Sequence, residues 1–154
     1  MIPELDRYHG IVLRQILMAH PKRFTVGVAD ISGRKDAFYL NGAAFQIKHS
    51  SKRLPPWQFT YLPENVTELV ELSATCNPVW VFLVCGTDGV VGLSIQELQA
   101  IIKPGSGGVA WVRVSRDRNA MYRVCGSAGD LSRAKPRGVQ AFVSLVATGQ
   151  IATT

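Results

Sequence analysis

The chain has 154 residues, 47% of them apolar, and its 17 Lys and Arg against 11 Asp and Glu give a net charge of +6. This length fits one folded domain that buries a sizeable core without disulfides or a structural metal. The apolar fraction excludes a disordered chain, and no apolar run reaches the roughly 18 residues of a membrane span. The N-terminus shows no secretory signal, and the three cysteines are widely spaced. Both features predict reduced thiols and a cytoplasmic protein without a membrane partner.

The first third of the chain predicts a helix followed by three strands. Apolar residues recur at steps of three and four over residues 4–19, which is typical of an amphipathic helix. The pair Asn41-Gly42 separates the second and third strands, and it is the strongest local signal for a β-hairpin because both positions tolerate a positive φ. The expected strands are Phe24–Asp30, Ala37–Leu40 and Ala43–Lys48.

The middle of the chain predicts a strand, a helix and a buried strand. Trp57–Leu62 alternates aromatic and polar residues and predicts a fourth strand whose aromatic side chains pack in the core. Pro63 opens a helix over Glu64–Cys76, and the uninterrupted apolar run Val79–Cys85 predicts a strand buried on both faces. We expect the apolar face of the helix to consist of Val66, Leu69, Val70 and Leu72.

The last third predicts a short strand, a helix and a second hairpin. Ser94 and Glu97 form the pattern of a capping box at the start of a helix that ends near Ile102. The hairpin pairs Val109–Ser115 with Ala120–Cys125 and carries arginines at its tip. The short strand covers Val90–Leu93.

The C-terminal segment is ambiguous. Val139–Ala147 fits either a strand or a short helix, and as an exposed apolar element it would favour a homo-oligomer. We expect residues 148–154 to form a flexible tail. The sequence therefore predicts one α/β (α+β) domain over residues 1–147, built on a single mixed sheet with a C-terminal β-hairpin.

The positive charge is concentrated in two places. Residues 104–154 carry 7 Lys and Arg against 2 Asp, and a second cluster, around residues 34–53, surrounds the third strand. Basic clusters attract phosphates through counterion release, which indicates DNA or RNA as a partner. The alternative is an ordinary soluble surface, because charge informs on partners rather than on fold.

The first hairpin brings together the residues with the clearest chemical rationale. A two-residue turn at Asn41-Gly42 places Asp36 opposite Ile47, and hence close to both Gln46 and Lys48. A carboxylate, an amide oxygen and a lysine suit phosphodiester hydrolysis, which needs a hard cation held by oxygens and a positive group beside the phosphorus. The alternative is that Asp36 is a strand-start residue and that Gln46 and Lys48 form a solvated strand face.

This order of elements, with Asp36 on the second strand and Gln46-Ile47-Lys48 on the third, resembles the PD-(D/E)XK nuclease superfamily and its Gln-x-Lys, Mrr-like branch. The resemblance implies an αβββαβ core and a Mg²⁺-dependent nuclease. It implies that Asp36 is the main metal ligand, that Gln46 adds an oxygen and that Lys48 is the catalytic cation. Glu4 or Asp6 would add a carboxylate in some branches. Contacts with the nucleic-acid backbone would come from Arg34, Lys52 and Arg53.

The chain departs from the superfamily pattern, because no proline precedes Asp36 and the second motif carboxylate is replaced by Gln46. Two further functions therefore stay open. One is a degenerate member that binds nucleic acid without cleaving it. The other is a small non-catalytic interaction or accessory protein. The degenerate member would bind nucleic acid or a protein partner through the arginines of the second hairpin, Arg113, Arg116, Arg118 and Arg123, and through the loop from Arg133 to Arg137.

Overall fold

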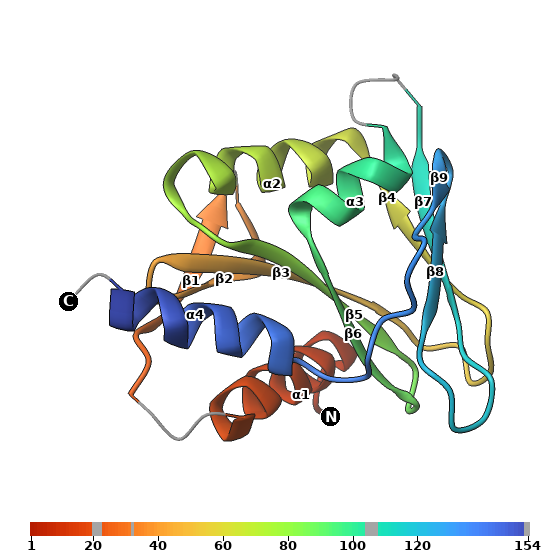
Figure 1. The fold of residues 1–154 in the computed structure, drawn as a ribbon, viewed down its shortest axis with the longest axis horizontal. Coiled ribbons are helices and arrows are strands. Elements are labelled where there is room, and N and C mark those ends of the chain that lie inside the picture. Colours follow the sequence, from red (N-terminus) through yellow and green to blue (C-terminus); the bar gives the residue numbers. More distant parts are fainter. Residues whose placement is uncertain (20–22, 32, 104–107, 153–154) are drawn as a thin grey trace.

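The computed structural model of the chain describes residues 1–19, 23–31, 33–103 and 108–152 and shows two sheets with four helices (Figure 1). The strands are β1 Val26–Ile31, β2 Arg34–Leu40, β3 Ala43–Ser50, β4 Trp57–Tyr61, β5 Val79–Cys85, β6 Gly89–Ser94, β7 Ala110–Ser115, β8 Arg123–Gly126 and β9 Gly129–Asp130. The helices are α1 Glu4–Ala19, α2 Pro63–Thr75, α3 Ile95–Ile102 and α4 Gln140–Ala152. The predicted α/β class is confirmed.

The first sheet has the strand order β1-β2-β3-β5-β6 and mixed pairing. Both β1 and β3 run antiparallel to β2, whereas β3 and β5 run parallel and β6 runs antiparallel to β5. Helices α1 and α4 cover one face, and α2 and α3 cover the other (Figure 1). All seven residues of β5 are buried, as the sequence predicts, because both faces of this central strand are covered.

The second sheet differs from the single mixed sheet expected from the sequence. Strand β4 pairs with β7, and the order is β4-β7-β8-β9. The reason is that β3 already pairs with β2 on one side and with β5 on the other, so β4 finds no free edge beside it. The aromatic face of β4 is buried as predicted, and Trp57, Phe59 and Tyr61 pack in the core that the two sheets share.

The ambiguous C-terminal segment forms helix α4. Phe142 and Val143 are fully buried and pack against Phe45 and Phe82 of the first sheet. The expectation of an exposed apolar element at this segment is therefore wrong, because its large apolar side chains apart from Leu145 are buried in the core. The helix continues beyond Ala147 through Thr148 to Ala152, into the segment expected as a tail, whose last two residues lie outside the described part of the chain. None of the described helices is long and apolar enough to cross a membrane.

Candidate active site

The hairpin between β2 and β3 has the register expected from the sequence. Asn41 adopts a positive φ of 54°, and the ladder runs from the pair Leu40–Ala43 to the pair Ala37–Gln46. Asp36 lies immediately beyond the last pair of this ladder. Gln46 and Lys48 share one face of β3 because side chains alternate along a strand. The local sequence thus brings Asp36, Gln46 and Lys48 to one end of the hairpin.

Helix α2 closes this end of the hairpin with a polar contact. The Gln46 side chain is fully buried, and its Nε2 donates to the Asn65 carbonyl and to Glu68 Oε1, both at 3.4 Å. Glu68 itself is only 2% exposed. The buried face of α2 therefore consists of Asn65, Glu68, Leu69 and Leu72. The prediction that Val70 belongs to the buried face is wrong. Val70 is exposed because the helix turns Asn65 and Glu68 toward Gln46.

Asp36 is the electrostatic centre of the site. Its carboxyl lies within hydrogen-bonding reach of the Glu68 carboxyl, and burial together with this neighbour raises the pKa of Glu68 to about 7. Two carboxyl groups so close together favour sharing one proton over carrying two charges. Asp36 also acts on His9, whose pKa is lowered by burial and partly restored by this carboxylate. A pair of carboxyl groups therefore lies inside the protein, and one of them, Glu68, has a pKa close to neutral pH.

Several polar atoms around Asp36 are buried without a hydrogen-bond partner in the described part of the chain. Three of them are carboxylate or amide oxygens, and the others are a hydroxyl and an imidazole nitrogen of residues on which the Asp36 carboxylate acts. Buried polar groups are normally paired, so such a cluster calls for a physical explanation. The atoms are Asp36 Oδ1, Gln46 Oε1, Glu68 Oε2, Tyr61 Oη and His9 Nε2.

Lys48 supplies the positive charge of the site. Its Nζ lies 4.8 Å from the centre of the Tyr61 ring, a cation–π contact that holds the ammonium beside the carboxyl pair. Burial lowers the pKa of Lys48, and the Asp36 carboxylate partly opposes this effect. The ammonium is thus held close to, but not paired with, a carboxylate in any ion pair that the described residues form.

Two open hollows give access to these groups. One, of about 370 Å³, is lined by Asp36 and Lys48 together with His49 and residues of β4. The other, of about 440 Å³, is lined by Glu68 with Arg34 and further residues of α2. Each carboxyl of the pair therefore lines an open hollow, Asp36 the smaller one and Glu68 the larger one.

The expected nucleic-acid contacts near the first hairpin lie at the rim of the site. Arg34 forms a 3.8 Å ion pair with Glu64, beside the larger hollow. Lys52 is exposed and donates from Nζ to the Pro56 carbonyl at 3.1 Å, and Arg53 follows it in the same exposed loop.

The acidic residues of α1 considered as extra ligands are on the helix whose Leu5 lines the hollow of Asp36 and Lys48. Glu4 lies 3.8 Å from His49, and Asp6 is exposed.

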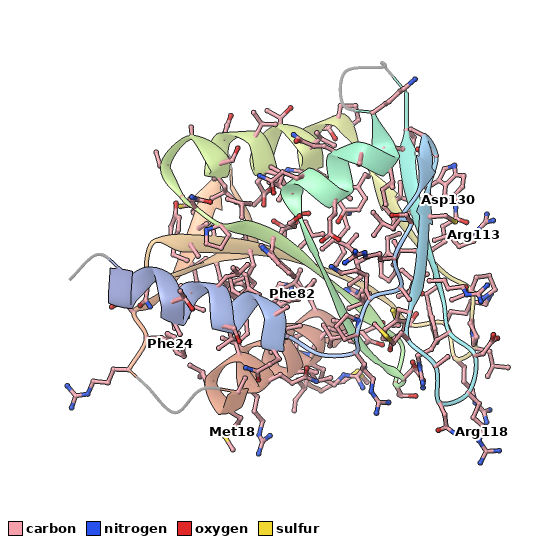
Figure 2. The ribbon with its side chains drawn as sticks, viewed as in Figure 1. Met18, Phe24, Phe82, Arg113, Arg118 and Asp130 are labelled. Atoms are coloured by element: carbon pink, nitrogen blue, oxygen red, sulfur yellow. The ribbon has the colours of Figure 1, made fainter. Side chains whose placement is uncertain are left out.

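The arginines of the second hairpin have different surroundings. Arg113 is exposed on the outer face of β7, and Arg118 is exposed at the hairpin tip (Figure 2). Arg116, expected as a nucleic-acid contact, is held by both carboxylate oxygens of Asp88 at 2.8 and 2.6 Å. The structure therefore leaves Arg113 and Arg118 facing solvent, whereas Arg116 is engaged within the protein.

Glu68 is the residue of the site that the sequence does not identify. It lies on a helix that also carries Glu64 and Glu71, so the three acids together look like a solvated face. The available signal is spacing, because Asn65, Glu68, Leu69 and Leu72 follow the steps of one helix face. Across the described residues, there is no group of three or more His, Cys, Asp or Glu side chains placed to hold a metal ion.

Comparisons with known proteins identify no relative of this chain. No protein-family model matches it, and neither the curated proteins nor the solved structures provide a match.

Proposed function

We propose that this protein is a nucleic-acid-associated phosphodiester hydrolase that uses a divalent cation at Asp36, Glu68 and Gln46. The observation that carries the proposal is the set of three buried oxygens on these side chains that accept no hydrogen bond from a neighbouring donor among the described residues, beside the ammonium of Lys48. Oxygen atoms from two carboxylates and one amide are the ligands that Mg²⁺ and Mn²⁺ prefer. Glu68 replaces the carboxylate that is missing at position 46.

The raised pKa of Glu68 fits such a site. Asp36 and Glu68 repel one another when both are ionised, and protonation of Glu68 relieves this repulsion. A bound divalent cation would do the same and would also lower the pKa of a coordinated water. Gln46 positions the pair, because its amide donates to Glu68 Oε1 while its own Oε1 stays available.

Lys48 provides the charge that phosphoryl transfer needs. An ammonium fixed over the Tyr61 ring can donate hydrogen bonds to the phosphate oxygens as negative charge develops on them. Burial makes this interaction stronger than it would be in water. Lys48 opens onto the 370 Å³ hollow, which gives a phosphate group access to the ammonium.

The order of elements supports the same proposal. The helix, the three antiparallel strands, the second helix and the parallel strand β5 follow the αβββαβ order that the PD-(D/E)XK resemblance implies, with β4 as an insertion. Asp36 lies on the second of these strands, and Gln46 and Lys48 lie on the third.

Cleavage of a supercoiled plasmid and of a circular single-stranded DNA, with Mg²⁺, with Mn²⁺ and with EDTA, tests the proposal. We expect cation-dependent cleavage that Asp36→Asn, Glu68→Gln and Lys48→Ala each reduce by at least about 100-fold. Matched controls are Asp30→Asn and Lys35→Ala, which change exposed residues of β1 and β2 and should retain full cleavage.

Either of two results would overturn the assignment. The first is cleavage that survives in all three site variants. The second is no cleavage together with a melting temperature that Mn²⁺ leaves unchanged. Salt-sensitive binding without cleavage would favour the non-catalytic alternative, in which Asp36 and Lys48 have no role.

A further inference from the structure

The outer face of the second sheet differs in character from its inner face. The inner side chains of β4, β7 and β8 are buried apolar residues, whereas the outer ones are polar, aromatic or basic. A solvated face of an antiparallel sheet is ordinary, but this one carries a half-buried tryptophan among cations. The outer residues are Gln58, Thr60, Trp111, Arg113, Ser115, Arg123 and Cys125.

Trp111 and Arg113 form a preorganised pair on this face. The Arg113 guanidinium carbon lies 4.8 Å from the centre of the Trp111 ring, and its Nη2 donates to Gln58 Oε1 at 3.1 Å. These two contacts hold the planar guanidinium in place although the side chain is exposed. Figure 2 shows Arg113 pointing outward from the sheet. An unpaired base can stack on an indole ring or on a guanidinium plane held in this way.

The pair is continuous with the candidate active site. Gln58 is the cross-strand partner of Arg113 in the β4–β7 ladder, and Thr60 is the partner of Trp111. The same Gln58 and Thr60 line the 370 Å³ hollow that contains Asp36 and Lys48. A ligand on the outer face of the sheet therefore reaches the hollow by crossing a single strand.

Charge favours a polyanion on this surface. Arg123 is exposed on the neighbouring strand β8, and Lys52 and Arg53 lie in the loop that leads into β4. Asp130, an acidic residue, lies at the far end of the cross-strand row that runs from Gln58 through Arg113 and Cys125. Phosphates along one strand can follow these cations while a base occupies the Trp111–Arg113 pair.

We propose that the outer face of the second sheet binds single-stranded nucleic acid, with one base stacked on the Trp111–Arg113 pair and the strand leading across β4 into the hollow. The inference rests on the proposed function and specifies its substrate class. Duplexes fit less well, because their bases are already stacked on one another and do not offer a free face to Trp111. This surface also differs from the nucleic-acid contacts that the sequence predicts at the second hairpin, because Arg116 does not belong to it.

Binding of a dye-labelled oligothymidine of about 12 nucleotides, measured by anisotropy in EDTA and low salt, tests the inference without any cleavage. We expect the single strand to bind at least about fivefold more tightly than a duplex of the same length. Trp111→Ala and Arg113→Lys should each weaken binding at least about fivefold, the latter because lysine keeps the charge but lacks the plane. Trp111→Phe should retain most of the affinity.

Arg14→Ala is the control for the loss of one positive charge away from this face, because Arg14 is exposed on α1, and it should change affinity by less than about twofold. Oligothymidine should also quench the fluorescence of Trp111, because Trp57 and Trp80 are buried at 1% and 7% exposure. The quenching should be lost in Trp111→Phe. Circular dichroism verifies that each variant is folded, and Arg113→Lys and Trp111→Phe carry the test if Trp111→Ala does not fold.

Equal or tighter binding of the duplex would overturn the inference. So would a loss of affinity in Arg113→Lys that does not exceed the loss in Arg14→Ala. The two proposals fail separately. Cleavage that ignores Trp111 and Arg113 removes this inference alone, whereas selective single-strand binding without cation-dependent cleavage removes the hydrolase alone.

Discussion

Arg116 donates to both carboxylate oxygens of Asp88, from Nε at 2.8 Å and from Nη2 at 2.6 Å. Tyr122 Oη donates to the same carboxylate at 2.6 Å. Asp88 lies in the turn between β5 and β6 of the first sheet, whereas Tyr122 and Arg116 lie in the hairpin of the second. This ion pair therefore fastens one sheet to the other, and it holds the second sheet in place beside the candidate active site.

Replacing Asp88 by Asn should destabilise the protein by about 1–3 kcal/mol, because Arg116 and Tyr122 would lose a charged acceptor. The hydrogen bond from Arg116 lowers the pKa of Asp88 to about 2. A lowered carboxyl pKa contributes stability that is present above the unfolded value, near 3.8, and is lost as pH falls toward 2. Urea unfolding at several pH values measures this effect.

The difference in free energy of unfolding between wild type and Asp88→Asn should therefore shrink below pH 4. Asp117→Asn in the same hairpin is the control, since Asp117 is exposed, and it should change stability by less than about 0.5 kcal/mol. A difference that stays constant down to pH 2 would contradict the role of the Asp88 carboxylate.

Glu68 should make stability depend on pH in the opposite sense. Burial and the Asp36 carboxyl raise its folded-state pKa from 4.5 to about 7, so the unfolded chain releases this proton first as pH rises. The wild type should then lose stability between these two pH values. In EDTA at pH 8, Glu68→Gln should be more stable than wild type by about 2 kcal/mol, whereas near pH 4.5 the gain should be small.

Thermal melts of wild type, Glu68→Gln and Glu71→Gln across this pH range check the prediction. Glu71 is exposed on the same helix, so its variant should follow the wild-type curve. Parallel curves for wild type and Glu68→Gln would show that Glu68 ionises normally.

Much of the fold follows from local sequence rules. Asn41-Gly42 specifies the first hairpin, because a positive φ at Asn41 selects the tight turn and the turn then sets the register. Ser94 and Glu97 form the predicted capping box, with Ser94 N donating to Glu97 Oε1 at 3.0 Å and Glu97 N donating to Ser94 Oγ at 3.1 Å. Both motifs satisfy backbone groups within a few residues, so neighbouring sequence suffices to predict them.

The remaining features depend on contacts between distant segments. The burial of Glu68 requires α2 to pack over Gln46, 22 positions away. The engagement of Arg116 requires Asp88, 28 positions away, and the second sheet requires β4 to pair with β7 across α2, β5, β6 and α3. No periodicity within one segment encodes such pairings, which is why the helix face of α2 and the sheet of β4 differ from expectation.

Replacing Gln46 by Glu tests whether position 46 faces the carboxyl pair. The Gln46 amide donates to Asn65 and Glu68, and a carboxylate there would lose both donations and repel Asp36 and Glu68. In EDTA, Gln46→Glu should lower the free energy of unfolding by about 2 kcal/mol or more. Millimolar Mn²⁺ should raise its melting temperature more than it raises that of the wild type, because three carboxylates hold the cation more tightly.

The control for Gln46→Glu is Gln96→Glu, which changes an exposed residue of α3 and should respond to Mn²⁺ as wild type does. An equal response of both variants would mean that Gln46 does not face a cation.

Gly126 tests the packing of α3 against the second sheet, and Gly10 provides the control. A Cβ on Gly126 of β8 would overlap the backbone carbonyl of Ile101 in α3, an oxygen that already accepts from Ala128 N at 2.7 Å. Gly126→Ala should therefore destabilise the protein by about 2–3 kcal/mol, since neither backbone segment can yield without separating α3 from the sheet. Gly10 of α1 has nothing within 4 Å of the corresponding position, so Gly10→Ala should stabilise the helix by about 0.5–1 kcal/mol. Urea denaturation of both variants measures the contrast, and a Gly126→Ala variant as stable as wild type would mean that α3 does not lie against β8.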